Sequence, residues 1–167
     1  MALEHTDLIS LVAEVAATFI GFSLVIGLLQ PEDTSAARRL QSMRAVAELA
    51  LIAAGGALLA LALDAFHLIP AHVWRFASAV LLVFWFTLHL LAIRRFKSAG
   101  TLLRESGFLQ FAGFIALIGV ALLLWNLIAP GAQSGGRYTA ALICALADSA
   151  FMFILATFSD GHEGPAT

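Results

Sequence analysis

The sequence predicts an all-α membrane protein, a bundle of five transmembrane helices. Of its 167 residues, 61% are hydrophobic and only 12% are charged, whereas a soluble domain carries about 25% charged residues. Five stretches hold about 20 or more mostly apolar residues each, which at a helical rise of about 1.5 Å matches a hydrocarbon core about 30 Å thick. The predicted helices cover residues 7–29, 43–66, 73–96, 108–129 and 137–158. They form one domain, residues 1–158, before a polar C-terminal tail, residues 159–167.

The connections between these stretches contain turn-forming and capping residues. Pro31 ends the first helix, and Thr34 or Ser35 is a suitable N-cap for the second. Pro70 marks the turn into the third helix, and a Pro/Gly/Ser segment around Pro130 separates the last two. No Lys or Arg precedes the first stretch, and its apolar core exceeds the roughly 7–15 residues of a signal peptide, so we expect a mature helix there.

The distribution of basic residues predicts the orientation. Arg75 and Arg137 lie on one side of the membrane, and the other seven of the nine Lys and Arg residues fall in the first and third connections. These seven are Arg38, Arg39, Arg44, Arg94, Arg95, Lys97 and Arg104. Cytoplasmic loops carry the excess of positive charge. We therefore expect an inner-membrane protein of a bacterium, with its N-terminus outside and its C-terminus in the cytoplasm.

Composition and motifs exclude several function classes. The net charge is −2 and there is no basic patch, which argues against nucleic-acid binding. Cys144 is the only cysteine, so the chain cannot form an intramolecular disulfide. The sequence lacks the hydrolase, metalloprotease, nucleotide-binding and redox fingerprints and shows no nucleophile–base pair. We expect that the protein is not an enzyme.

Two acids within the apolar stretches carry the main functional hypothesis. Glu14 lies about 10 Å below the outer surface and Asp148 about 15 Å below it, counting from the helix ends. Thr18 and Ser149 are their polar neighbours, and Asp64 lies near the outer end of the second helix. With no Lys or Arg at this depth, the acids could share a proton, bind a cation or line water. We predict that these five residues line an ion pathway.

A second polar cluster is expected toward the cytoplasmic side. Arg44 and Glu48 have the i, i+4 spacing of a helical ion pair, and His89 lies at a similar depth on the next helix. We expect Glu48 to be structural. A metal on His89 would need two or three more donors at this depth, and Glu48 alone is too few to predict such a site. No cofactor is predicted, although a bound cation or lipid would be compatible with the sequence. A haem on His89 is a weaker hypothesis, because it needs a second axial ligand and His67 and His72 lie on the opposite side of the membrane.

Side chains near the helix ends are expected at the membrane surface. Trp74, Trp125 and Tyr138 lie where amphipathic rings favour the interface between lipid and water. Asn126 can reach the headgroup region, where water would solvate its amide. These four residues are therefore interpreted as anchors and surface groups.

Two functions remain open at this point. In the first, the chain is a homo-oligomer in the lipid bilayer that conducts cations or protons, because five helices are too few to enclose a wide path and symmetry turns one acid into a ring. The first helix is the chosen lining helix, since it combines Glu14, Thr18 and glycines on neighbouring faces. Its small residues Ala13, Ala17 and Gly21, four apart, are interpreted as ordinary helix packing within the monomer, with a seam between subunits as the alternative. In the alternative, the chain is a non-catalytic accessory or scaffold subunit of a larger membrane complex.

Overall fold

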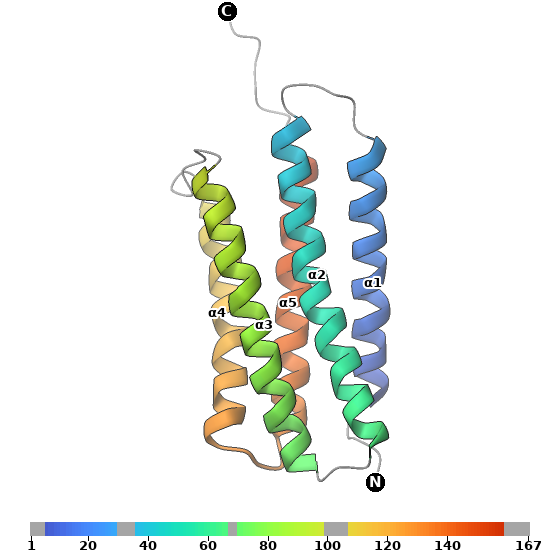
Figure 1. Cartoon of the computed structure of the whole chain (residues 1–167), viewed down its shortest axis with the longest axis vertical. Helices are drawn as coiled ribbons and strands as arrows, with labels where there is room; N and C mark the ends of the chain where they lie inside the picture. Colours follow the sequence, from blue (N-terminus) through green and yellow to red (C-terminus); the bar gives the residue numbers. More distant parts are fainter. Residues whose placement is uncertain (1–5, 30–35, 67–69, 99–106, 159–167) are drawn as a thin grey trace, which may run out of the picture.

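The computed structural model describes residues 6–29, 36–66, 70–98 and 107–158, which form five α-helices (Figure 1). The helices are α1 (Thr6–Leu29), α2 (Ala36–Ala65), α3 (Pro70–Ser98), α4 (Gly107–Ile128) and α5 (Ser134–Phe158). The predicted all-α bundle of five helices is confirmed. The predicted polar tail, residues 159–167, and the predicted caps Thr34 and Ser35 lie outside the described residues.

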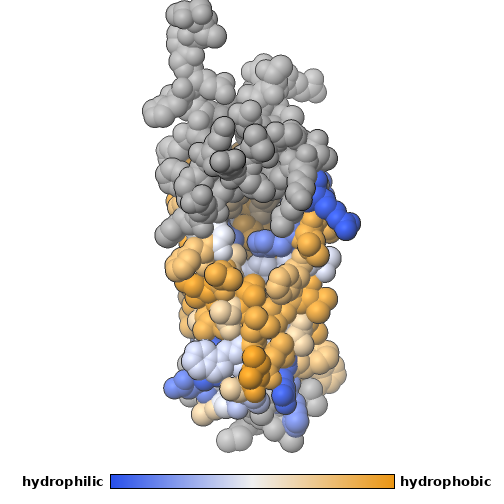
Figure 2. All heavy atoms as spheres, turned by 90° about the vertical axis from the view of Figure 1, so that its left-hand side faces the viewer, coloured by the Kyte–Doolittle hydropathy of each residue, from blue (hydrophilic) through white to orange (hydrophobic). Residues whose placement is uncertain are grey.

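Within the described residues, four helices contain an apolar stretch long enough to cross a membrane. These stretches are Thr6–Leu29, Met43–Ala65, His72–Leu91 and Ser134–Ile154, and α4 adds a shorter one, Gly113–Ile128. Figure 2 shows the corresponding apolar belt on the side formed by α3 and α4, with polar groups at the end where α5 begins. The chain is an integral membrane protein.

The helix α2 begins at Ala36, seven residues before the predicted apolar stretch. Hydropathy marks the part of a helix that crosses the lipid, whereas the backbone remains helical as long as its residues favour it. The first turns of α2 contain Ala, Arg, Leu and Gln, all good helix formers. The helix α3 also begins before its predicted apolar stretch, at Pro70. Proline is tolerated at the first helical position because the N–H that it lacks would have no partner within the helix.

The helix α5 lies at the centre of the bundle (Figure 1). In the described part of the chain it contacts all four other helices, while α1 contacts α2 and α5 and neither α3 nor α4. Helices α1, α3 and α5 run in one direction and α2 and α4 in the other (Figure 1). As a result α1 forms one edge of the bundle, and the pair α3 and α4 forms the opposite edge.

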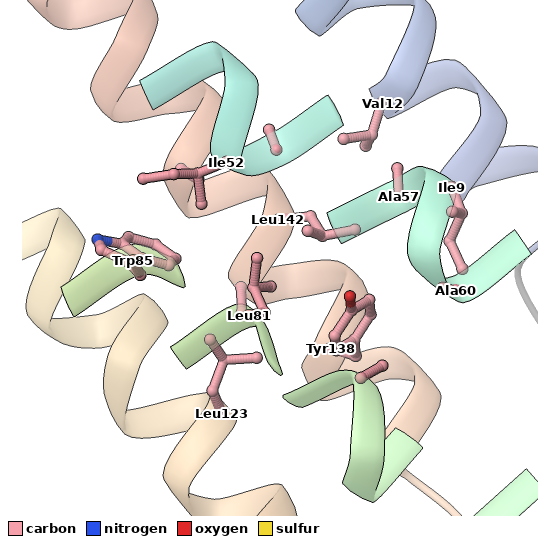
Figure 3. Packing of buried hydrophobic residues seen from close by; sticks show 14 of the residues in the cluster. Ile9, Val12, Ile52, Ala57, Ala60, Leu81, Trp85, Leu123, Tyr138 and Leu142 are labelled. Carbon is pink, nitrogen blue, oxygen red and sulfur yellow. The ribbon is translucent and has the colours of Figure 1, made fainter. Parts of the chain in front are cut away.

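Small residues on α2 bring the neighbouring helices close. Ile9 and Val12 of α1 pack toward Ala57 and Ala60 of α2, and all four are buried (Figure 3). A methyl side chain keeps the two backbones near each other, which is the main source of packing between helices in lipid. The α1 contact face is therefore apolar around Ile9 and Val12.

The contact of α2 with α3 and α5 depends on Gly56 and Tyr138. A Cβ added to Gly56 would lie 2.5 Å from Leu142 Cδ2 and 3.0 Å from Leu81 Cδ1, so a larger residue does not fit without rearrangement. The Tyr138 hydroxyl donates a 2.8 Å hydrogen bond to the Gly56 carbonyl, and its ring lies 5.5 Å from that of Trp74. Tyr138 (Figure 3) and Trp74 are thus buried, at 0% and 5% exposure, and their interpretation as anchors at the membrane surface was wrong.

Candidate polar sites of the membrane bundle

Glu14 lies at the centre of the exposed face of α1. At about 100° per residue, Asp7, Gly21 and Val25 fall within about 20° of Glu14, and Thr18 within about 40°. All five side chains are exposed. The buried residues of α1, which are Ile9, Val12, Ala16 and Ser23, lie about 140–180° away from Glu14 on this helical wheel. The polar stripe of α1 thus points away from its own bundle.

The neighbours of Glu14 on this face are either small or hydrogen-bonded within α1. The Thr18 hydroxyl donates to the Glu14 main-chain carbonyl at 2.9 Å, so it is bonded within the helix. A Cβ added to Gly21 would have no atom within 4 Å, which leaves open space beside the helix. Ala17 is exposed beside them, so of the three small residues expected to pack within the monomer only Ala13 touches the core. This face of α1 can therefore accommodate another helix at short range.

Asp148 and Ser149 are inside the bundle. Asp148 is 3% exposed and Ser149 is fully buried. The Ser149 hydroxyl donates a 2.9 Å hydrogen bond to the Val46 carbonyl of α2. Asp148 Oδ1 is buried without a hydrogen-bond partner, and the carboxylate forms no ion pair among the described residues.

The structure places Glu14 and Asp148 at one depth but on different faces. Phe19 of α1 and Phe153 of α5 meet edge to face with ring centroids 6.0 Å apart, and α1 and α5 run in the same direction (Figure 1). Glu14 and Asp148 each lie five residues before this contact. Glu14, however, is exposed at the edge and Asp148 is buried at the centre. The bundle does not bring the two acids onto a common face.

The predicted second cluster is only partly assembled. Arg44 Nε and Glu48 Oε1 form the expected i, i+4 ion pair at 3.0 Å. His89 is half-buried, and its ring centroid lies 6.4 Å from that of Trp85. Among the described residues there is no group of three or more His, Cys, Asp or Glu that could hold a metal. Asp64, also half-buried, lies one residue before the end of α2.

A polar network where α4 ends and α5 begins was not predicted from the sequence. Asn126 is fully buried, which corrects its interpretation as a solvated surface residue. Its Nδ2 donates to the Ser134 carbonyl at 2.9 Å and lies 3.4 Å from Ser78 Oγ, joining α3, α4 and α5. The Ser134 hydroxyl accepts a 2.9 Å bond from the Gly131 N–H. The short connection after α4 was the available signal, because it forces Asn126 close to the start of α5.

The two arginines outside the basic loops cap the C-terminal end of α4. Arg75 Nε donates to the Leu127 carbonyl at 3.2 Å, and Arg137 Nη1 donates to the Ala129 carbonyl at 2.9 Å. The Arg137 guanidinium also lies 4.5 Å from the centre of the exposed Trp125 ring. Cations stabilise unpaired carbonyls at a helix C-terminus. These residues have a clear structural use. Among the described residues, the polar features still unexplained are the exposed face of α1 and three buried atoms without a hydrogen-bond partner: Asp148 Oδ1, Trp85 Nε1 and Asn126 Oδ1.

Comparison of the chain with protein-family models, with curated proteins and with solved structures finds no significant match. Functional inference therefore depends on the geometry of the polar groups. An acid on the outside of a transmembrane helix and an unpaired acid inside the bundle are the two arrangements that packing alone does not explain. Each has a different chemical consequence, because the first faces the surroundings of the bundle and the second is closed off from them.

Proposed function

We propose that the chain forms homo-oligomers that conduct cations, protons included, across a bacterial inner membrane. The observation that supports this function is the position of Glu14 at the middle of the exposed face of α1. Acids within membrane spans almost always face a bundle interior or a water-filled cavity, since a charge at the bilayer centre costs at least about 2.5–3.5 kcal/mol. A single copy in lipid offers Glu14 neither surrounding.

A second copy of the chain supplies what Glu14 lacks. Ala17 and Gly21 flank Glu14 on the exposed face and let another α1 approach closely. A cyclic arrangement repeats the acid around the axis, and a ring of acids attracts cations. The proposed path runs along Glu14 and Thr18, with Asp64 near its outer mouth because α2 ends where α1 begins (Figure 1).

The proposed orientation follows from the basic loops. We place the N-terminus outside and the C-terminus in the cytoplasm, which fits five helices whose first and last ends lie on opposite sides of the bundle (Figure 1). Arg44 and Arg94 are exposed near the proposed cytoplasmic side. Arg75 and Arg137, on the proposed outer side, are both bonded to carbonyls of the α4 end.

Association through α1 is tested with a bulky substitution on its exposed face. Ala17→Leu should reduce the oligomer to smaller species in lipid nanodiscs, measured by native mass spectrometry, because the added side chain separates the two helices. Ala121→Leu is the matched control, since Ala121 is an exposed alanine on α4, at the opposite edge of the bundle. Equal oligomers for both variants, or a parent that is monomeric in lipid, would overturn the proposed assembly.

Conduction is tested by cation flux in liposomes. Glu14→Gln should abolish or strongly reduce the flux, because the amide carries no charge, while Glu48→Gln, the same change at an ion-paired acid, should keep its selectivity. Flux through Glu14→Gln at the parent rate would refute the role of Glu14. A parent without flux that becomes stable only with a different protein would instead establish an accessory subunit.

A further inference from the structure

Three buried side-chain atoms of the described residues have no hydrogen-bond partner: Asn126 Oδ1 and two atoms on helices that run in parallel. The latter two are Trp85 Nε1 on α3 and Asp148 Oδ1 on α5. The rings of Trp74 and Tyr138 fix the register of these helices, with centroids 5.5 Å apart. Trp85 lies eleven residues beyond Trp74, and Asp148 lies ten beyond Tyr138. The two residues therefore lie at similar depths in the bundle.

Contacts around Gly119 bring the Trp85 ring next to Cys144, which lies one helical turn before Asp148. A Cβ added to Gly119 of α4 would lie 2.7 Å from Trp85 Cη2 and 3.3 Å from the Cβ of Cys144. The Trp85 ring thus fills the space between α4 and α5 beside Cys144. Cys144 and Asp148 are four residues apart and share one face of α5. Trp85 and Asp148, 1% and 3% exposed, are accordingly both buried in the part of the interior around Cys144.

No described cation neutralises Asp148 from any helix packed on α5. Glu14 of α1 points away from the bundle, Arg44 of α2 is paired with Glu48, and His89 of α3 lies one turn beyond Trp85. Residues 113–128 of α4 contain no titratable group. The other titratable or charged side chains described on α1, α2 and α3 lie nearer the helix ends: Asp7, Asp64, His72, Arg75 and Arg94.

The hydrogen-bonding groups of Trp85 and Asp148 determine which ligand suits this part of the interior. An indole N–H only donates a hydrogen bond, so it suits a water oxygen and disfavours a metal cation. A buried carboxylate without a cation costs several kcal/mol, whereas the neutral acid does not carry this penalty. A water molecule can accept from the indole and donate to the carboxyl oxygen, which would satisfy both unpaired atoms.

We propose that Asp148 is a proton-binding site in the bundle interior, where its neutral carboxyl shares a bound water with the Trp85 indole. This site lies on a different face from the Glu14 stripe and does not depend on the proposed conduction. Asp148 takes up the proton from water, so the step forms an O–H bond on the carboxylate and leaves hydroxide to the solvent. The pair acts as a proton store at the depth of Glu14.

Infrared spectroscopy of the purified protein in lipid tests the proton site at neutral pH. The parent should show a C=O stretch of a protonated carboxyl that is lost in Asp148→Asn and kept in Glu14→Gln, the control acid at the same depth. Labelling aspartate with ¹³C in the parent should shift the band, a check that needs no substitution. An unshifted band, a band that survives Asp148→Asn, or no such band in the parent overturns the proposal.

The shared water is tested separately with Trp85→Phe. Phenylalanine removes the indole donor, so the carboxyl band should move in frequency because its hydrogen-bonding partner changes. Phe84→Leu is the control, since Phe84 is next in sequence and has no polar atom. The same shift in both variants, or none in Trp85→Phe, refutes the shared water.

Discussion

Replacing Gly119 by alanine tests the packing that holds Trp85 between α4 and α5. The added Cβ would lie 2.7 Å from Trp85 Cη2 and 3.3 Å from Cys144 Cβ, whereas carbon atoms pack best at about 3.5–4.0 Å. The Trp85 ring is rigid and 1% exposed, and the Cys144 Cβ is fixed to the backbone of α5. Relief of the overlap therefore requires a helix to move. Overpacking of this kind costs about 1–3 kcal/mol.

The same helix provides the control. A Cβ added to Gly113 would have no atom within 4 Å, so Gly113→Ala should leave stability unchanged or raise it by about 0.5–1 kcal/mol through helix propensity. The free energy of unfolding is measured by titrating denaturing detergent into mixed micelles and following helical circular dichroism. Equal stabilities of Gly119→Ala and Gly113→Ala would refute the packing argument.

A double variant identifies the ring as the cause. Trp85→Phe alone should destabilise the bundle, because it leaves part of a well-packed space empty. Combined with Gly119→Ala, it should cost less than the sum of the two single changes, since the smaller ring gives room to the new methyl group. Additive losses would show that the Gly119 variant acts through another contact.

Three further predictions use the described contacts. An impermeant thiol reagent added outside should label Gln133→Cys and spare Ser98→Cys, and the reverse pattern would refute the orientation. Gln133 is chosen because it is exposed, whereas its neighbour Ser134 is buried and hydrogen-bonded. Glu48→Gln should lower the melting temperature, because its arginine partner loses the ion pair, and an unchanged temperature would contradict a structural role. Tyr138→Phe should lower the free energy of unfolding by about 1 kcal/mol, since it deletes one buried hydrogen bond and leaves the ring in place, and no loss would argue against that bond.

The sequence by itself determined the helices and the depth of their polar residues. Apolar length fixes where a helix can cross lipid, because every backbone polar group must be bonded within it. Counting residues from the helix ends predicted similar depths for Glu14 and Asp148, and the Phe19–Phe153 contact places both at the same level. The Arg44–Glu48 ion pair was also predictable, since residues four apart are neighbours on any helix.

Only the tertiary structure decided which way each helix faces. Lipid and protein interior are both apolar, so a membrane helix carries little amphipathic signal that would tell its buried face from its exposed one. Glu14 and Asp148 are both acids within apolar stretches and lie at the same depth. Nevertheless Glu14 lies on the outside of the bundle and Asp148 inside it. The weak amphipathic signal is also why Tyr138 and Asn126, expected at the surface, are buried. The Tyr138 hydroxyl and the Asn126 Nδ2 donate to carbonyls of other helices, and the apolar pattern of their own helices does not reveal these partners.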